Sequence, residues 1–274
     1  ISKGLREAGY QVTEIDVDKN IYEVLRDLGP EAVFNGLHGT WGEDGCVQGL
    51  LETLEIPYTH SGVKSSALAM DKILSKKMFQ SVGIPCAEDR IVDTNELFAK
   101  EPMQRPFVVK PYNDGSSVGV VIVKENDVFS QKQDGPWHQT EQLMVERYIP
   151  GRELTVSVMD GKALCVTELL PKQGFYDYSA KYQDGMTDHI LPADVSDNLC
   201  DLLKDMAVRA HEILGCRGVS RSDFRMDGED IYILETNTQP GMTPLSLVPE
   251  QAKYIGLSFS ELVHWIMEDA SCGR

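Results

Sequence analysis

Residues 221–237 read R-S-D-F-R-M-D-G-E-D-I-Y-I-L-E-T-N, and this stretch decides the fold of the chain. Polar and apolar side chains alternate from Arg221 to Met226, as they do in a β-strand with one solvated face. The segment M-D-G-E-D (226–230) is typical of a turn, and I-Y-I-L-E-T-N (231–237) is typical of a second strand. The sequence therefore predicts a β-hairpin.

The length of the hairpin loop decides whether Asp223 and Glu235 share a face of the sheet. Successive strand residues point to opposite faces, so a two-residue turn at Asp227-Gly228 would separate the two carboxylates. A loop of odd length centred on Glu229, such as residues 228–230, would bring them opposite each other. We therefore predict the odd loop.

Two carboxylates and an amide, those of Asp223, Glu235 and Asn237, would then lie on one face. All are hard oxygen donors, which suit Mg²⁺ far better than zinc. The alternative is an acidic hairpin rim in an acidic protein. The polar, turn-rich loop that follows, N-T-Q-P-G-M-T (237–243), favours a site, because sites are often built where a strand ends in such a loop.

Composition and charge limit the classes of function. The chain has 274 residues, 42% of them hydrophobic, and a net charge of −17, which argues against a nucleic-acid partner. No apolar run approaches the ~20 residues of a membrane span. The six cysteines are scattered without a C-x-x-C pair, which is typical of reduced, mostly buried thiols in a cytosolic protein. The chain opens on a helical pattern, so we expect a further strand upstream of Ile1.

The first 60 residues alternate between strand and helix patterns, as an α/β domain does. We predict strands at 11–17 and 31–37 and a helix at 21–28. The loop H-G-T-W-G-E-D-G (38–45) follows the second strand and leads into a helix through Leu54. A polar, Gly-rich loop in this position is where doubly wound sheets bind ligands, so His38 is a candidate site residue. The alternative is a loop histidine packed on Trp41.

A second candidate region surrounds Lys110. Residues 61–82 predict one or two helices with Asp71-Lys72 at their joint, and a strand follows within 83–92. The apolar strand 105–111 ends on Lys110 and continues into Y-N-D-G-S-S-V-G (112–119), a loop that could close over phosphates. It lacks the helix-opening G-K-[ST] of a P-loop, and most such loops are ordinary turns. A lysine at the end of an apolar strand is placed to pair with buried anionic oxygen.

The remaining segments complete a mixed α/β pattern. Residues 141–159 predict two strands about a Pro150-Gly151 turn, flanked by Glu146 and Glu153. In a nucleotide site the backbone between them would contact a base edge, and Glu153 could accept hydrogen bonds from the ribose hydroxyls; the alternative is that both carboxylates are simply exposed on a hairpin. We predict a third strand at 162–171, and an aromatic lid or cover at 175–184. Helices are predicted at 195–214 and within 249–270.

Seven segments in this order resemble the ATP-grasp ligases, and most closely the D-alanine–D-alanine ligases. They are H-G-T-W-G-E-D-G, D-K at 71–72, V-V-K-P with G-S-S-V-G, E-R-Y-I-P-G-R-E, F-Y-D-Y-S-A-K-Y, R-S-D-F and L-E-T-N-T-Q-P-G-M-T. The resemblance covers nearly the whole chain. It implies an α/β (α+β) fold of three α/β domains, at 1–61, 62–147 and 148–274, with ATP held between two antiparallel sheets. It also implies ATP-dependent joining of two D-alanines for peptidoglycan precursors.

The resemblance assigns roles to individual residues. It implies two Mg²⁺ ions, with Mn²⁺ as a substitute, held by Asp223, Glu235 and Asn237. For ATP, it implies phosphate, flap, adenine and ribose contacts from Lys72, Lys110, Ser116, Ser117, Val118, Glu146, Tyr148, Ile149, Glu153 and Lys181. It implies catalytic roles for Arg221, Gly241, Ser116, Tyr182 and Lys181, with Arg221 and the Gly241 N–H at the oxyanion and a Tyr182–Ser116 latch on the lid. It implies D-alanine contacts from His38, Arg221, Gly241, Ser246 and Leu247.

One departure and several alternatives accompany the resemblance. The family's first strand, with its Ser-rich loop and substrate-orienting glutamate, has no match here, in keeping with the expected upstream strand. A D-alanine–D-lactate ligase, another carboxylate–amine ligase of the superfamily, and a nucleotide-binding module without turnover are the alternatives. The lid sequence favours the dipeptide-forming enzyme. The resemblance further implies a cytoplasmic homodimer.

Overall fold

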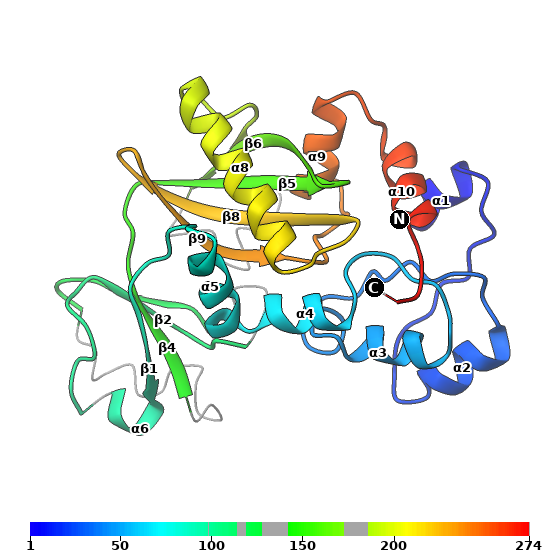
Figure 1. Cartoon of the computed structure of the whole chain (residues 1–274), viewed down its shortest axis with the longest axis horizontal. Coiled ribbons are helices and arrows are strands. Elements are labelled where there is room, and N and C mark those ends of the chain that lie inside the picture. The colour runs from blue at the N-terminus through cyan, green and yellow to red at the C-terminus, as the bar shows by residue number, and fades with distance from the viewer. Residues whose placement is uncertain (98, 114–118, 128–141, 173–185, 274) are drawn as a thin grey trace.

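The computed structural model describes residues 1–97, 99–113, 119–127, 142–172 and 186–273, which form two antiparallel sheets with helices packed beside them (Figure 1). The small sheet has the order β1 (Asp89–Asp93), β4 (Gln142–Arg147), β2 (Phe107–Lys110), β3 (Val121–Val123). The large sheet has the order β7 (Thr187–Ile190), β6 (Lys162–Pro171), β5 (Arg152–Met159), β8 (Val219–Asp227), β9 (Asp230–Asn237). The predicted α/β (α+β) fold class with two antiparallel sheets is confirmed.

The large sheet has one dry face and one polar face. Helices α8 (Asp197–Ile213) and α5 (Lys72–Ser81) pack on the dry face, as Figure 1 shows for α8 across β5 and β8. Leu154, Val156 and Phe224 belong to this core and are fully buried. Because side chains alternate along each strand, the residues between them point to the opposite face. That face carries the polar side chains of the candidate site.

The hairpin of β8 and β9 forms as predicted, but by a different route. Asp227 pairs with Asp230, so the loop contains two residues and the predicted odd loop is wrong. A β-bulge then shifts the register between Asp223 and Phe224, and leaves Leu234 as the extra residue on β9. Asp223 therefore pairs with Glu235 after all. A bulge adds one residue to one strand and restores the parity that the even loop removes.

The segment 141–159 is not a hairpin, in contrast to the simplest interpretation of its sequence. Strand β4 already pairs with β1 and β2 on its two sides, so it has no free edge for β5. The chain instead crosses from the small to the large sheet at Pro150-Gly151. Gly151 has φ +88°, and a Cβ there would collide with the Met226 carbonyl oxygen. Glycine permits both the left-handed backbone and this close approach.

The N-terminal region is helical and less regular than predicted. Its helices are α1 (Ser2–Glu7), α2 (Ile21–Leu28) and α3 (Cys46–Thr53). The strand predicted at 11–17 does not form: these residues are mostly exposed and lie outside both sheets. The strand predicted at 31–37 is reduced to a bridge between Val33 and Tyr58, because a strand persists only where a neighbour supplies its hydrogen bonds.

Most of the remaining predicted elements are confirmed. Helices α4 (Val63–Met70) and α5 meet at Asp71, whose side chain caps α5 by accepting hydrogen bonds from the backbone N–H groups of Ile73 and Leu74. The chain also forms α6 (Thr94–Leu97), α9 (Leu247–Tyr254) and α10 (Phe259–Glu268), and α10 packs on α1. The expectation of mostly buried cysteines is wrong, because Cys165 and Cys216 are buried whereas Cys46 and Cys272 are exposed. Among the described residues, no helix is long and apolar enough to cross a membrane.

Candidate active site

The polar face of the large sheet centres on Asp223, which is buried and held by three hydrogen bonds. Arg221 donates from Nε to Oδ1 (2.9 Å) and from Nη2 to Oδ2 (2.8 Å), and both residues lie on the same face of β8. Thr155 of β5 donates its hydroxyl to Oδ1 (2.7 Å). The bidentate, charge-assisted contact with Arg221 fixes the orientation of the Asp223 carboxylate.

Glu235 and Asn237 lie beside this pair on strand β9. The register places Glu235 opposite Asp223, and Asn237 opposite Arg221, so the predicted shared face is confirmed. Lys72, the first residue of α5, reaches Glu235 from across the site, with Nζ 3.4 Å from Oε2. The backbone N–H of Gln239 donates to Asn237 Oδ1 (2.8 Å), which orients that oxygen.

The donor chemistry of this face fits a magnesium ion. Asp223, Glu235 and Asn237 supply hard oxygen ligands, and Mg²⁺ takes few protein ligands because it keeps waters and phosphate oxygens. Each carboxylate faces a cation, Arg221 or Lys72, which balances its charge. In the described ranges no group of three or more His, Cys, Asp and Glu side chains offers a metal site.

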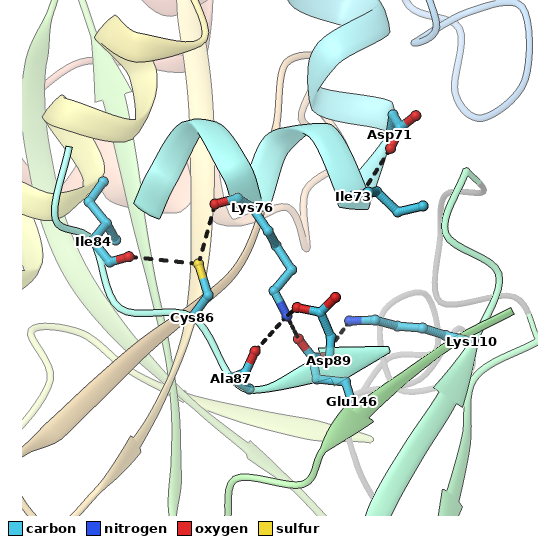
Figure 2. A network of polar contacts seen from close by, with 9 residues as sticks. All are labelled: Asp71, Ile73, Lys76, Ile84, Cys86, Ala87, Asp89, Lys110 and Glu146. Carbon is cyan, nitrogen blue, oxygen red and sulfur yellow. Dashed lines mark hydrogen bonds and ion pairs between the residues drawn. The ribbon is translucent and has the colours of Figure 1, made fainter. Parts of the chain in front are cut away.

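A buried cluster of lysines and carboxylates joins the small sheet to α5 (Figure 2). Glu146 of β4 accepts from Lys110 Nζ at Oε2 (2.7 Å) and from Lys76 Nζ at Oε1 (2.6 Å). Lys76 also lies 2.7 Å from Asp89 Oδ1 and donates to the carbonyl of Ala87 (2.7 Å). Lys110 pairs with buried anionic oxygen, that of Glu146, while its contact with a phosphate stays a prediction; the exposed-hairpin alternative for Glu146 is wrong.

The charges of this cluster shift the pKa values of Glu146 and Lys76 toward their ionised forms. Burial would raise the pKa of Glu146, but the ammonium groups of Lys110 and Lys76 outweigh it and hold that pKa below its ordinary value. Burial would likewise lower the pKa of Lys76, but Glu146 and Asp89 raise it. The adjacent Cys86 thiol is affected mainly by burial, which raises its pKa to about 11 and keeps it protonated.

Sequence reasoning missed Lys76, although a signal was present. Lys72, Ser75, Lys76 and Phe79 form the buried face of α5, at the spacing of one side of a helix. A lysine at such a position requires a carboxylate partner, because burying an unpaired charge is costly. The sequence does not say which carboxylate that is.

The candidate adenine and ribose residues gather around Arg225 of β8. Its guanidinium donates from Nε to the carbonyl of Ile149 (3.0 Å) and lies 3.2 Å from Glu153 Oε2. It also lies over the ring of Tyr148, 5.6 Å from the centroid. The structure thus brings Tyr148, Ile149 and Glu153 together at the crossover between the sheets. Arg225, which organises them, was not singled out from the sequence.

The remaining candidates lie at two loops. His38 is exposed, with Nδ1 3.2 Å from Glu43 Oε1, and Trp41 in the same loop is 65% exposed. Ser246 precedes α9, and its hydroxyl accepts from the backbone N–H of Thr243 (2.9 Å). A Cβ on Gly241 would lie 2.8 Å from that hydroxyl, so the Gly241 backbone and Ser246 are close neighbours.

Leu247 begins α9, where it is buried against Leu169. The start of a helix offers unpaired backbone N–H groups and a positive dipole end, which favour an anion. A second set of candidates falls outside the described residues, together with most of the phosphate flap and the aromatic segment. These candidates are Ser116, Ser117, Val118, Lys181 and Tyr182, which include the two residues of the predicted latch.

Comparisons with known proteins show the family to which the chain is similar. The family models described as D-ala D-ala ligase N-terminus and C-terminus match residues 4–61 and 78–268. The D-alanine–D-alanine ligase of Ruegeria sp. (strain TM1040) is 51% identical over 100% of this chain and 90% of its own length. That of Cereibacter sphaeroides (strain ATCC 17025) is 53% identical over 100% and 89%. The crystal structure of the Bacillus anthracis D-alanine–D-alanine ligase complexed with ATP is 31% identical, with a TM-score of 0.82 over 98% of this chain and 88% of that one.

Proposed function

This chain belongs to the D-alanine–D-alanine ligase family, and on that premise we propose that it joins two D-alanine molecules at the expense of ATP, for peptidoglycan precursors. The observation that carries the proposal within this molecule is the meeting of Asp223, Glu235 and Asn237 on one polar face, with Lys72 opposite them. Such a face fits the Mg²⁺-bound phosphates of a nucleotide. The predicted division into domains at 61 and 147 remains a prediction.

The reaction needs activation because a carboxylate and an amine do not condense in water. An oxygen of the first D-alanine carboxylate attacks the γ-phosphorus of ATP, the bond to ADP breaks, and an acyl phosphate forms. The amine of the second D-alanine then attacks the carbonyl carbon, and inorganic phosphate leaves. Catalysis of the first step depends on positioning and on balancing negative charge.

The nucleotide would lie between the two sheets. Lys72 and Lys110 bind the α- and β-phosphates, and both lysines are already held at the site by Glu235 and Glu146. The backbone at Tyr148 and Ile149 contacts the adenine edge, and Glu153 accepts from the ribose hydroxyls. Ser116, Ser117 and Val118 close over the phosphates, and Lys181 reaches the transferred group.

Asp223, Glu235 and Asn237 would hold two Mg²⁺ ions. When bound, the ions neutralise charge on the phosphate oxygens. Thr155 orients Asp223 and the Gln239 N–H orients Asn237, so two of the three ligands are fixed before any ion arrives. Such preorganisation lowers the cost of binding.

In the second step, attack of the amine places a negative charge on the oxygen bonded to the former carboxylate carbon, which is the oxyanion. Arg221 and the backbone N–H of Gly241 donate to it, a role worth a few kcal/mol in comparable sites. Ser246 and the N-terminus of α9 at Leu247 bind the carboxylate of the second D-alanine. His38 lies near the first. Tyr182 holds the lid to Ser116 and keeps water from the acyl phosphate.

Phosphate release from ATP tests the proposal. Release in the wild type should depend strictly on D-alanine, and Asp223→Asn or Glu235→Gln should abolish it while circular dichroism remains that of the folded protein. Glu229→Gln, an exposed change at the tip of the same hairpin, is the matched control and should retain activity. Unchanged activity in the Asp223 and Glu235 variants would refute the metal assignment.

The same assay separates the alternatives. Incorporation of D-lactate at neutral pH would identify a D-alanine–D-lactate ligase, and ATP binding without amino-acid-dependent release would identify a module without turnover. The relatives cited above are D-alanine–D-alanine ligases, which favours the dipeptide product. Cytoplasmic location and a homodimer are proposed from the family alone, and gel filtration with light scattering tests the dimer.

A further inference from the structure

Two buried amide side chains join the N-terminal region to the end of β9. Asn35 and Gln239 are each 2% exposed. Asn35 Nδ2 donates to Gln239 Oε1 (2.8 Å), and Gln239 Nε2 donates to the carbonyl of Leu37 (2.5 Å). Two directional hydrogen bonds thus connect Gln239 to the N-terminal region, one from Asn35, 204 positions away in the sequence, and one to Leu37, 202 positions away.

Each amide also holds a segment of the candidate active site. Asn35 Nδ2 donates to the carbonyl of Gly42 (3.1 Å), inside the loop 38–45 that carries His38. The backbone N–H of Gln239 donates to Asn237 Oδ1 (2.8 Å), the proposed magnesium ligand. A continuous chain of contacts therefore runs from the His38 loop through Asn35 and Gln239 to Asn237.

We propose that Asn35 and Gln239 form an amide clamp, a pair of positioning residues that fixes the His38 loop relative to the metal-bearing end of β9. The inference rests on the proposed function, because the two ends of the clamp would carry the first D-alanine and the phosphate-bound metal. The first D-alanine, bound near His38, supplies the reacting carboxylate oxygen, and the nucleotide at the end of β9 supplies the γ-phosphorus. The alignment of these two atoms therefore depends on the clamp.

The chemistry of the pair suits this role better than an apolar contact would. Amide hydrogen bonds are directional, and a buried amide that loses its partner is left unsatisfied at a considerable cost, so few alternative packings compete. Both side chains are neutral, so the clamp keeps its strength across pH. A hydrophobic contact of the same size would hold the segments together without fixing their register.

The clamp is tested by hydrogen exchange and by kinetics on the full chain. In Gln239→Met, amide exchange over residues 36–45 should accelerate roughly tenfold or more, because the segment loses its tether. The kcat/KM for D-alanine should fall about tenfold or more, as expected for a misplaced reactant, while the KM for ATP should change less than about threefold. Gln239→Glu retains the acceptor for Asn35 but buries a carboxylate against the Leu37 carbonyl oxygen, so it should accelerate exchange over 36–45 at least as much as Gln239→Met.

Controls separate positioning from general destabilisation. Ser65→Ala removes a hydrogen bond of 2.5 Å between α4 and the Gly215 carbonyl, away from the clamp, and should alter neither readout. The double variant Asn35→Leu/Gln239→Met should match the more severe single variant, since the pair acts as one contact. Unchanged amide exchange over residues 36–45 in Gln239→Met would overturn the clamp. A fall in kcat/KM of the double variant equal to the product of the falls in the two single variants would also overturn it. Absence of D-alanine-dependent turnover in the wild type would instead overturn the proposed function, because the exchange result does not depend on activity.

Discussion

Replacing Lys76 with methionine should destabilise the protein by about 3–5 kcal/mol, the usual cost of removing one member of a buried ion pair. The Lys76 side chain is 3% exposed, and its Nζ contacts Glu146 Oε1 (2.6 Å), Asp89 Oδ1 (2.7 Å) and the Ala87 carbonyl (2.7 Å). Two ammonium groups balance two carboxylates in the native cluster. Lys76→Met leaves two carboxylates sharing Lys110, with one uncompensated negative charge.

Thermal unfolding followed by circular dichroism measures this effect. One kcal/mol shifts the Tm of a protein near this size by roughly 2–4 °C, so we expect a loss of about 6–20 °C. The double variant Lys76→Met/Asp89→Asn restores charge balance around Glu146 and should recover part of that loss. A difference between the double variant and the sum of the single variants isolates the interaction between the two side chains.

A lysine on the surface provides the control. Lys3 has a side chain that is 90% exposed and lies 3.8 Å from Glu7, so Lys3→Met should leave the Tm within about 1 °C of the wild type. If Lys76→Met changed the Tm no more than Lys3→Met does, the buried cluster would not be the tie between α5 and the small sheet. A double variant less stable than Lys76→Met would also contradict the reasoning from charge balance.

Three further predictions address pH, backbone geometry and nucleotide binding. Burial lowers the pKa of His211 from 6.5 to about 4, so the folded state binds fewer protons than the unfolded state in this range, and stability should fall by about 3 kcal/mol as pH drops from 6.5 to 4. Urea unfolding of His211→Gln should show a flatter pH profile there, and an unaltered profile would assign the dependence to other groups. Gly151→Ala should cost at least twice the roughly 1 kcal/mol expected for Gly161→Ala, because both have a left-handed φ but only a Cβ at 151 meets the Met226 carbonyl; equal losses in urea unfolding would count against this close contact. Lys110→Met should raise the KM for ATP much more than the KM for D-alanine, and the reverse ranking in steady-state kinetics would remove Lys110 from the phosphate site.

Sequence patterns correctly predicted the helices and strands whose formation depends mainly on neighbouring residues. The strand at 162–171 and the joint between α4 and α5 follow from side-chain periodicity and from the cap at Asp71, which are properties of neighbouring residues. The convergence of Asp223 and Glu235 was predicted because it depends on parity within one hairpin. The predicted loop length was wrong because a bulge at Leu234 and a loop of odd length both place Asp223 and Glu235 on the same face of the sheet.

Features that depend on distant partners could not be predicted in this way. The chain crosses between sheets at Pro150-Gly151 because both sides of β4 are already paired. That pairing cannot be predicted from the sequence around the turn. Glu146, which pairs with Lys76, is 70 residues away from it, and Gln239, which pairs with Asn35, is 204 residues away. The pattern at 11–17 indicated a strand, yet no neighbouring strand pairs with it among the described residues.

The bulge at Leu234 also has a practical use for labelling this protein. It lies between the exposed tip, residues 227–230, and the paired positions of Asp223 and Glu235, so the register of the ligands is set on the far side of the bulge from the tip. Exposed loop tips of this kind tolerate inserted sequence well. A short peptide tag or a cysteine for a fluorescent dye, placed between Gly228 and Glu229, would therefore report on the hairpin from outside while leaving the carboxylates in place.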